Sequence, residues 1–295
     1  MVRIKKKFSP LDAALCIATT AVVLFVIHRV STDLNYRWNW SVIPQYLFRY
    51  DEATSRWIPN LLMQGFFMTI KLSLWAMVLA TIVGTAIGLL RMSGSLFFRM
   101  IARSYVELLR NVPPLVLIFI FYFFIGDQLM AVIGAEEFIR SRSPELQRFF
   151  SIIFAPPSSF SAFLSALTTL VLYEGAYITE IVRAGIESIE RGQWEASAST
   201  GLAKWQQLRF VVLPQAVRRT LPPLAGQFIS TIKDSAIVSV VSIQELTFQG
   251  MELMAATYLT FEIWITVTAL YFILTFSLSL AMRRLELRFR QHGAL

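Results

Sequence analysis

Six apolar stretches recur along the chain, and each is long enough to cross a membrane as a helix. A hydrocarbon core is about 30 Å thick, so a crossing helix needs about 20 mostly apolar residues. Helices are required there because lipid offers no partner to an unpaired backbone donor or acceptor. The sequence therefore predicts an all-α polytopic membrane protein with about six transmembrane helices. The predicted spans cover residues 11–29, 66–90, 108–126, 160–182, 222–244 and 257–282.

Composition agrees with this fold class, because 56% of the 295 residues are hydrophobic, more than a soluble domain of this length can bury.

The first span follows the basic run RIKKK and is longer than the apolar region of a secretory signal, so we interpret it as a retained anchor. The third span begins with the polar run ELLRN and Pro113-Pro114. We expect its first turns to lie at the surface and the chain to enter the bilayer after the prolines.

The basic residues indicate the orientation of these spans. If the amino terminus is cytoplasmic, most Arg and Lys residues fall on the cytoplasmic side, at 3–7, 91–110, 183–219 and 283–290. This distribution follows the positive-inside rule. It predicts that both termini are cytoplasmic. The net charge of +8 is then explained by topology and by contact with anionic head groups, and it requires no nucleic-acid partner.

The residue inventory argues against an enzyme. The sequence has one cysteine, Cys16, and two histidines, His28 and His292, all near the ends of the chain. These residues cannot form a disulfide, a His-rich metal site or a buried catalytic dyad. The phosphate-binding pattern G-x-x-x-x-G-K-[ST] does not occur in the sequence. We therefore expect no catalytic residues, no metal and no cofactor bound by the chain itself.

A polar segment at residues 187–215 separates two of the apolar spans. Within it Leu202, Trp205, Leu208 and Val212 are spaced as one face of a helix, and Gly201 before them is free to adopt a left-handed turn. Two short helices meeting at a glycine would form a projection that a soluble partner can bind. An amphipathic helix lying among the lipid head groups is the alternative that these residues leave open.

The same segment carries a family resemblance. It reads EASASTGLAKWQQLRFVVLP from Glu195 to Pro214, which resembles the EAA loop of ABC importer permeases. That loop has the form E-A-A, three residues, G, nine residues and I-x-L-P, so Ser197 and Val211 are conservative departures. The resemblance implies that the loop docks into a separate ATPase subunit. The residues it assigns to ATPase coupling are Glu195, Ala196, Ser197, Gly201, Leu213 and Pro214.

Other stretches resemble the polar amino acid branch of these permeases over about residues 60–290. They are TIKLSL from Thr69, YVELLRNVPPLVLIFIFYF from Tyr105, GAYITEIVRAGIESIERGQWEA from Gly175 and LPQAVRR from Leu213. The resemblance implies a five-helix type I permease core at residues 59–295, preceded by a tail, anchor helix and outer segment at residues 1–58. It further implies a bacterial inner-membrane permease that pairs with an identical or homologous permease. Two ATPase subunits would carry ATP and Mg, and an extracytoplasmic binding protein would deliver a polar amino acid.

Charged residues near the middle of the membrane are candidates for the substrate path, because such charges need a partner or a wet cavity. Helical rise places Glu174, Lys233 and Asp234 at about this depth. Gly175, Tyr177 and Ser235 next to them would add backbone access and hydroxyl groups. Two interpretations remain open. These residues form either a polar cavity that binds an amino acid, or an ion pair between Lys233 and one of the carboxylates that only fixes helix packing.

Other intramembrane features have structural interpretations. Lys71 and Glu262 are expected at the outer surface, and Glu180 is expected to pair with Arg183. The small residues Ala80, Gly84 and Gly88 are expected to allow close helix packing.

A secondary amino acid transporter independent of ATPase remains the alternative function, although the sequence shows no inverted repeat. A channel would need a ring of polar pore residues, which the sequence does not mark.

Overall fold

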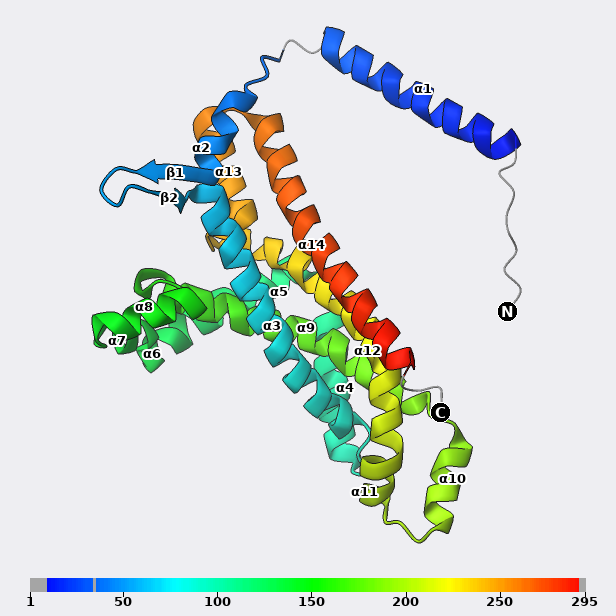
Figure 1. Cartoon of the computed structure of the whole chain (residues 1–295). Helices are drawn as coiled ribbons and strands as arrows, with labels where there is room; N and C mark the ends of the chain where they lie inside the picture. Colours follow the sequence, from blue (N-terminus) through cyan, green and yellow to red (C-terminus); the bar gives the residue numbers. More distant parts are fainter. Residues whose placement is uncertain (1–9, 34–35, 292–295) are drawn as a thin grey trace. The chain divides into compact units, whose positions relative to one another are not determined.

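The computed structural model describes residues 10–33 and 36–291. It separates after Trp40 into two units, of which the first holds α1 and the second holds all later elements (Figure 1). The predicted boundary between the amino-terminal part at residues 1–58 and the permease core at residues 59–295 stays a prediction. The helices are α1 Pro10–Asp33, α2 Ile43–Leu47, α3 Leu61–Arg91, α4 Leu96–Asn111, α5 Pro114–Phe121, α6 Met130–Ile133, α7 Ala135–Arg140, α8 Pro144–Ile153, α9 Phe160–Glu187, α10 Arg191–Ser199, α11 Lys204–Gln207, α12 Leu213–Asp234, α13 Leu246–Thr257 and α14 Thr260–Gln291. The strands β1 Phe48–Asp51 and β2 Arg56–Pro59 form an antiparallel hairpin in which Phe48 pairs with Pro59.

Helix α1 has the character of a helix surrounded by lipid. Its apolar part is Pro10–Phe25, and large apolar side chains such as Leu15, Ile17 and Leu24 are exposed. The hydroxyls of Thr19 and Thr20 donate to backbone carbonyls one turn earlier, at 2.8 Å in both cases, so these polar groups are paired within the helix. A helix that is apolar on all sides suits a membrane.

The core of the second unit is built around α3 and α9. Helix α9 is the most buried of the long apolar helices, and its side chains Phe163, Leu170 and Ile178 have almost no exposed surface. Small residues on α3 allow the two helices to approach closely, because a Cβ atom at Gly84 would lie 2.7 Å from the Ile178 side chain. The Thr179 hydroxyl donates to the Gly84 carbonyl oxygen at 3.2 Å. The small-residue stripe therefore serves packing, as the sequence predicted.

Replacing Gly84 with Leu is expected to lower the free energy of unfolding by about 1–3 kcal/mol, because the added side chain has no space against α9. The thermal unfolding midpoint of the detergent-solubilised protein measures this change. Ala86→Leu is the matched control, since Ala86 lies two residues away on an exposed part of α3. Equal midpoints for the two variants would show that α3 and α9 do not pack closely at this position.

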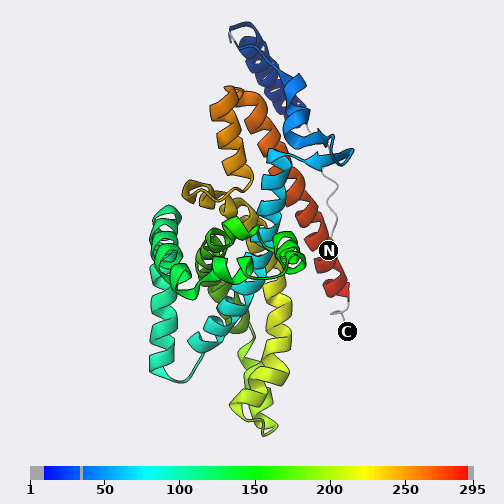
Figure 2. The same cartoon turned by 90° about the vertical axis from the view of Figure 1, so that its left-hand side faces the viewer.

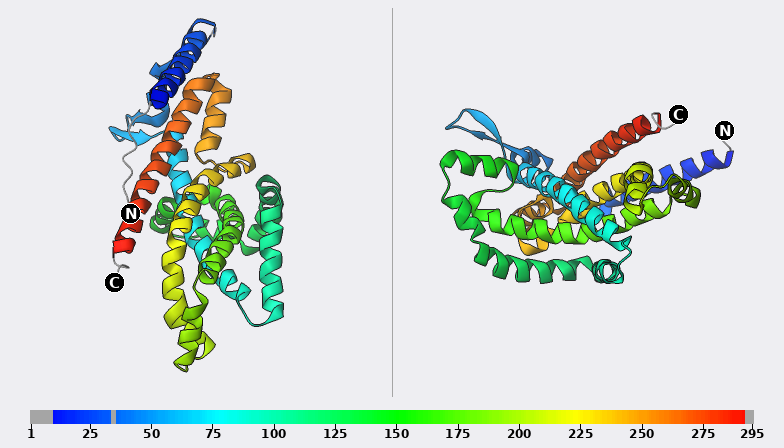
Figure 3. Two further views of the ribbon diagram at one scale, coloured as in Figure 1. Left: turned by 90° about the vertical axis from the view of Figure 1, so that its right-hand side faces the viewer. Right: turned by 90° about the horizontal axis from the view of Figure 1, so that it is seen from below.

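Helices long and apolar enough to span a membrane agree with most of the predicted spans. In the described residues they are Leu61–Arg91, Pro157–Glu187, Lys204–Val241 and Thr260–Arg284. The pair Leu96–Asn111 and Pro114–Phe124 is apolar enough to count as a fifth if it is a single span, and it is bent by 112°. The bend falls at Pro113-Pro114, where the sequence predicted a surface helix followed by a membrane helix. Helix α4 packs along α9 before the chain turns (Figure 3).

The span predicted at residues 222–244 has different limits in the structure. Helix α12 begins at Leu213, contains Pro222 and Pro223 in its interior and ends at Asp234, where a 3₁₀ segment continues to Val241. Interior prolines usually end a helix, which is why the sequence placed its start there. Membrane helices tolerate them when neighbouring helices and side chains satisfy the freed backbone groups. Lys233 and Asp234 therefore lie in the last turn of α12.

The two ends of the second unit carry different structures. The hairpin, α2 and α13 lie at one end, and α10 and α11 lie at the other (Figure 1). Helix α3 runs from the hairpin end toward α10 and α11. After the orientation that the sequence predicts, we call the hairpin end the outer end and the end with α10 and α11 the inner end.

Candidate functional site

The segment 187–215 folds as two short helices that meet at a glycine, as predicted. Helix α10 ends at Ser199 and α11 begins at Lys204. Between them Gly201 has a φ angle of +82°, and no atom lies within 4 Å of where its Cβ would be. L-residues rarely adopt this left-handed conformation, whereas glycine does so without strain. The segment projects from the end of the bundle (Figure 2).

Hydrogen bonds fasten this projection to the membrane helices. The Arg219 guanidinium on α12 donates to the carbonyl oxygen of Ser188, which follows α9. Gln215 on α12 donates to the Gln193 side chain on α10 at 3.1 Å. Val212 and Ile186 are buried in one apolar cluster beneath the projection. These contacts join the projection to α9 and α12.

The residues predicted for ATPase coupling differ in exposure. Glu195 and Ala196 are exposed on α10, whereas Ser197 is buried and its hydroxyl donates to the Trp194 carbonyl at 2.9 Å. Leu213 and Pro214 begin α12. Of the predicted apolar face, Val212 is buried and Leu202 and Leu208 are partly buried.

Trp205 departs from that face, since it is 60% exposed. Leu202 lies in the loop before α11, which begins at Lys204, and a π-helical turn at Leu208–Val212 follows α11. The four residues therefore do not lie on one regular helix, and their spacing does not keep the side chains on one face. The exposed surface of the projection therefore combines Glu195, Ala196, Gly201 and Trp205.

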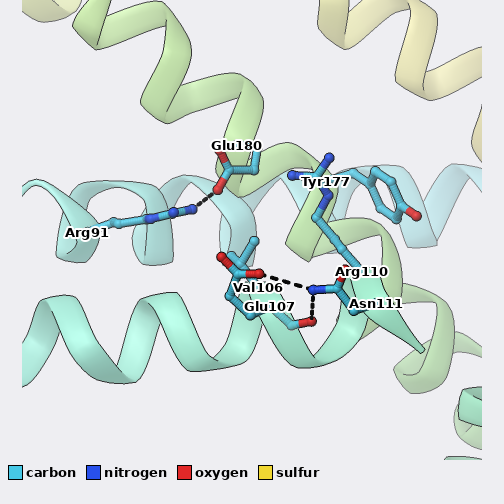
Figure 4. A pocket seen from close by; sticks show the side chains of 7 residues that line it. All are labelled: Arg91, Val106, Glu107, Arg110, Asn111, Tyr177 and Glu180. Atoms are coloured by element: carbon cyan, nitrogen blue, oxygen red, sulfur yellow. Dashed lines mark hydrogen bonds and ion pairs between the residues drawn. The ribbon is translucent and has the colours of Figure 1, made fainter.

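A polar cavity of about 340 Å³ opens at the inner end of the α3, α4 and α9 group (Figure 4). It is lined by Arg91, Val106, Glu107, Arg110, Asn111, Tyr177 and Glu180. Charges of both signs line it, and they lie where α3 ends, along the amphipathic helix α4 and on α9.

Arg110 is the cation of this cavity that lacks a carboxylate partner. Among the described residues, Arg91 pairs with Glu180, while Glu107 accepts a hydrogen bond from the Asn111 amide at 3.0 Å. The Arg110 guanidinium instead lies over the Tyr177 ring, 5.1 Å from its centroid. A guanidinium held by an aromatic face keeps its N–H donors available for a carboxylate.

A series of ion pairs extends from this cavity toward the projection at residues 187–215. Arg183 donates to Glu180 at 2.9 Å, which confirms the predicted pair, and it also pairs with Glu187 at the end of α9. Because Glu180 binds Arg91 as well, the chain joins α3 to α9. These contacts tie the inner wall of the cavity to the helix that leads into α10.

Deeper in the bundle Glu174 and Asp234 lie close enough to interact electrostatically. Glu174 is fully buried, and one of its oxygens accepts a hydrogen bond from the Gln227 amide at 2.6 Å. Its Oε1 atom has no hydrogen-bond partner. Tyr177 lies one turn away on α9 and accepts a hydrogen bond from the Tyr173 hydroxyl at 3.2 Å. Tyr177 therefore belongs both to the polar cavity and to the neighbourhood of Glu174.

The other predicted path residues have different environments. Gly175 is buried where a Cβ would meet the Tyr105 hydroxyl at 2.9 Å, and Ser235 is buried with its hydroxyl donating to the Ile232 carbonyl at 2.8 Å. Lys233 is exposed, and within the described part of the chain it forms no ion pair with Glu174 or Asp234. The structure thus brings Glu174 and Asp234 close together and places Tyr177 one turn from Glu174 on α9, while Lys233 is exposed and pairs with neither carboxylate within the described residues.

Sequence reasoning missed several residues of the cavity: Arg91, Glu107, Arg110, Asn111 and the neighbouring Gln227. A signal for three of them was present, because Glu107, Arg110 and Asn111 are spaced by three and one and therefore share a helix face. In the sequence, the polar run ELLRN that contains these residues indicated only that the third span begins at the surface.

Comparisons with known proteins agree with this geometry. Residues 80–291 match the family described as "Binding-protein-dependent transport system inner membrane component". The chain is 33% identical over 230 residues to the glutamine transport system permease protein GlnP of Escherichia coli (strain K12), covering 78% of this chain and 93% of that protein. It is 31% identical over 256 residues to the glutamate/aspartate import permease protein GltJ of the same strain, covering 87% and 96%. A crystal structure described as an amino acid ABC transporter with histidines has a TM-score of 0.65 and 29% identity, covering 86% of this chain and 100% of that one.

Proposed function

Because the chain belongs to the family of binding-protein-dependent transport system inner membrane components, we propose that it is the permease subunit of an ABC importer for a polar amino acid. It is a multi-pass inner membrane protein with an all-helical core. Its relatives are named for the transport of glutamine and of glutamate and aspartate. These are polar amino acids, which matches the polar cavity between α3, α4 and α9.

One observation carries this proposal. The helices that contact the polar residues inside the bundle, α9 and α12, are the same helices that hold the coupling projection of residues 187–215. A partner that moves the projection would move Tyr177, Glu180 and Gln227 as well. Such an arrangement suits import that is driven by a separate ATPase.

The cavity supplies a recognition chemistry for a zwitterion. Arg110 would bind the carboxylate of the amino acid, and the carboxylate of Glu107 would receive its ammonium group. We retain Glu174, Gly175, Tyr177, Lys233, Asp234 and Ser235 as the proposed substrate path. In this path Glu174 and Asp234 offer carboxylates deeper in the membrane than the cavity.

The assembly that we propose follows from the coupling projection. Glu195, Ala196, Ser197, Gly201, Leu213 and Pro214 would contact or position the surface that an ATPase subunit binds. Two ATPase subunits would hold ATP and Mg, a second permease would complete the pathway, and an extracytoplasmic binding protein would supply the amino acid. Both termini and the projection would face the cytoplasm, in agreement with the distribution of basic residues.

Replacing Glu174 with Gln is expected to lower amino acid uptake at least about tenfold, because the unpaired oxygen of a buried carboxylate can no longer attract a cationic group. Assembly with the ATPase should persist, since Gln has nearly the same shape. Uptake into proteoliposomes and co-purification measure the two effects. Glu252→Gln on the exposed side of α13 is the control and should transport normally. Normal uptake by Glu174→Gln would remove Glu174 from the substrate path.

The proposed function is tested by reconstituting the permease with its ATPase in nanodiscs and adding the binding protein with single amino acids. We expect ATP hydrolysis to rise when the binding protein carries glutamine, glutamate or aspartate. A complex whose ATP hydrolysis responds to none of the twenty amino acids would contradict the amino acid substrate. Failure of the chain to assemble with any ATPase subunit would contradict the importer itself.

A further inference from the structure

A second cavity, of about 450 Å³, lies at the opposite end of α3 from Arg91. It is enclosed by the end of β2, the first turns of α3, the end of α8 and the start of α13. Its polar lining consists of Gln64, Lys71, Ser151, Ser159, Gln244 and Gln249. Lys71 and Arg91 are 20 residues apart on one helix, a separation of about 30 Å, so this outer cavity is distinct from the inner one.

Lys71 brings a positive charge into the outer cavity. Its Nζ atom donates to the Ser151 carbonyl oxygen at 2.7 Å. Within the described residues it has no carboxylate partner, and no Asp or Glu lines the cavity. An ammonium group has three donors, so two remain for an anionic ligand.

Gln249 also lines this cavity. Its side chain is 3% exposed, and its Oε1 atom has neither a hydrogen-bond partner nor appreciable exposed surface, so the amide is turned away from the open space. A buried carbonyl oxygen without a donor is unfavourable, so buried polar atoms of this kind are nearly always paired in folded proteins. A ligand with N–H groups would satisfy it.

The nearby carboxylate of Glu245 does not compete for such a ligand. It caps the start of α13 by accepting hydrogen bonds from the backbone N–H groups of Thr247 and Phe248, at 2.9 and 2.8 Å. The Tyr271 hydroxyl also donates to it, at 2.7 Å. Its acceptor capacity is therefore used inside the protein, which leaves Lys71 as the charged group of the outer cavity among the described residues.

We propose that the outer cavity is a second binding site for the transported amino acid, which it holds before the amino acid reaches the inner cavity. The carboxylate of the ligand binds the Lys71 ammonium, and its own ammonium donates to Gln249 Oε1 when the side-chain amide of Gln249 rotates toward the cavity. The inference rests on the proposed function, because it takes the ligand to be the imported amino acid. Separate donor and acceptor groups on α3 and α13 would then orient the ligand on arrival.

The test is equilibrium binding of radiolabelled glutamine and glutamate to the permease and ATPase complex in nanodiscs, without the binding protein. We expect wild type to bind at two sites, Lys71→Met to retain one and Lys71→Arg to recover both. Gln249→Leu should weaken the outer site about tenfold. Arg148→Met is the matched control, because Arg148 is an exposed cation on α8 that does not line the cavity, and it should bind as wild type does.

The outcomes separate this site from the proposed function. If wild type binds no amino acid and Arg110→Met changes nothing, the proposed function fails together with the outer site. If wild type shows a single site that Arg110→Met removes and Lys71→Met leaves intact, only the outer site is wrong. A zwitterionic phospholipid head group has the same chemistry, so the titration is repeated with and without phosphatidylethanolamine in the nanodisc. Loss of the outer site in its presence would assign the cavity to lipid and overturn the proposal.

Discussion

Replacing Arg110 with Met is expected to lower amino acid uptake about 100-fold, the effect of losing a charged hydrogen-bonding partner inside the membrane. Arg110 is the guanidinium of the inner cavity whose donors are not taken by a carboxylate, and the Tyr177 ring fixes its position. The methionine side chain keeps the length and the apolar contacts of the arginine stem. The loss should therefore reflect the missing charge and not a collapsed cavity.

Initial rates of uptake at several substrate concentrations measure this effect. Arg110→Lys keeps the charge but not the planar pair of donors, so we expect it to fall between the methionine variant and wild type. Arg99→Met removes an exposed cation from the same helix outside the cavity and should transport normally. If Arg110→Met and Arg99→Met have equal rates, Arg110 does not bind the substrate.

Replacing Gly201 with Leu is expected to reduce substrate-stimulated ATP hydrolysis about tenfold while amino acid binding stays unchanged. The φ angle of +82° at this position costs an L-residue about 1–2 kcal/mol, so the turn between α10 and α11 should change its conformation. The structure has open space around Gly201, so a steric clash within the chain does not account for the effect. The altered turn would present Trp205 and Ala196 to the ATPase in a different arrangement.

Gly201→Asn is the matched control for this prediction. Asn is similar in size to Leu but adopts the left-handed conformation more readily. We expect it to retain most of the coupling. If the Leu and Asn variants lose coupling equally, bulk at the docking surface and not the turn is responsible. If neither variant differs from wild type, Gly201 has no part in coupling.

The sequence predicted the membrane helices and the coupling projection because both depend on local patterns. The length of apolar runs locates α3, α9 and α14, and the small residues Ala80, Gly84 and Gly88 already indicate a close helix contact. The glycine between two short helical patterns predicts the turn between α10 and α11 without knowledge of any distant residue.

The inner cavity could not be predicted in the same way. Its charged residues come from three helices, and Arg110 reaches Tyr177 because α4 packs along α9. Depth along a single helix therefore selected Glu174 as a candidate but could not show that the Gln227 amide donates to it or that Lys233 forms no ion pair with it. The direction of a side chain around its helix depends on packing, which periodicity alone does not fix.

Two outer charges illustrate the same limit. Lys71 was expected to extend to the surface, but it donates to the carbonyl oxygen of Ser151, whose helix α8 folds back over α3. Glu262 was expected at the rim and is fully buried at the start of α14. Both positions follow from segments far away in the sequence that cover the outer end of α3 and α14.

Uptake of radiolabelled amino acid into liposomes tests whether a separate ATPase drives this permease. The vesicles contain the permease alone, the permease with its ATPase subunits, or both with ATP inside and liganded binding protein outside. We predict accumulation above the external concentration only in the complete system with ATP. Accumulation by the permease alone, driven by an ion gradient, would contradict the importer mechanism and favour a secondary transporter.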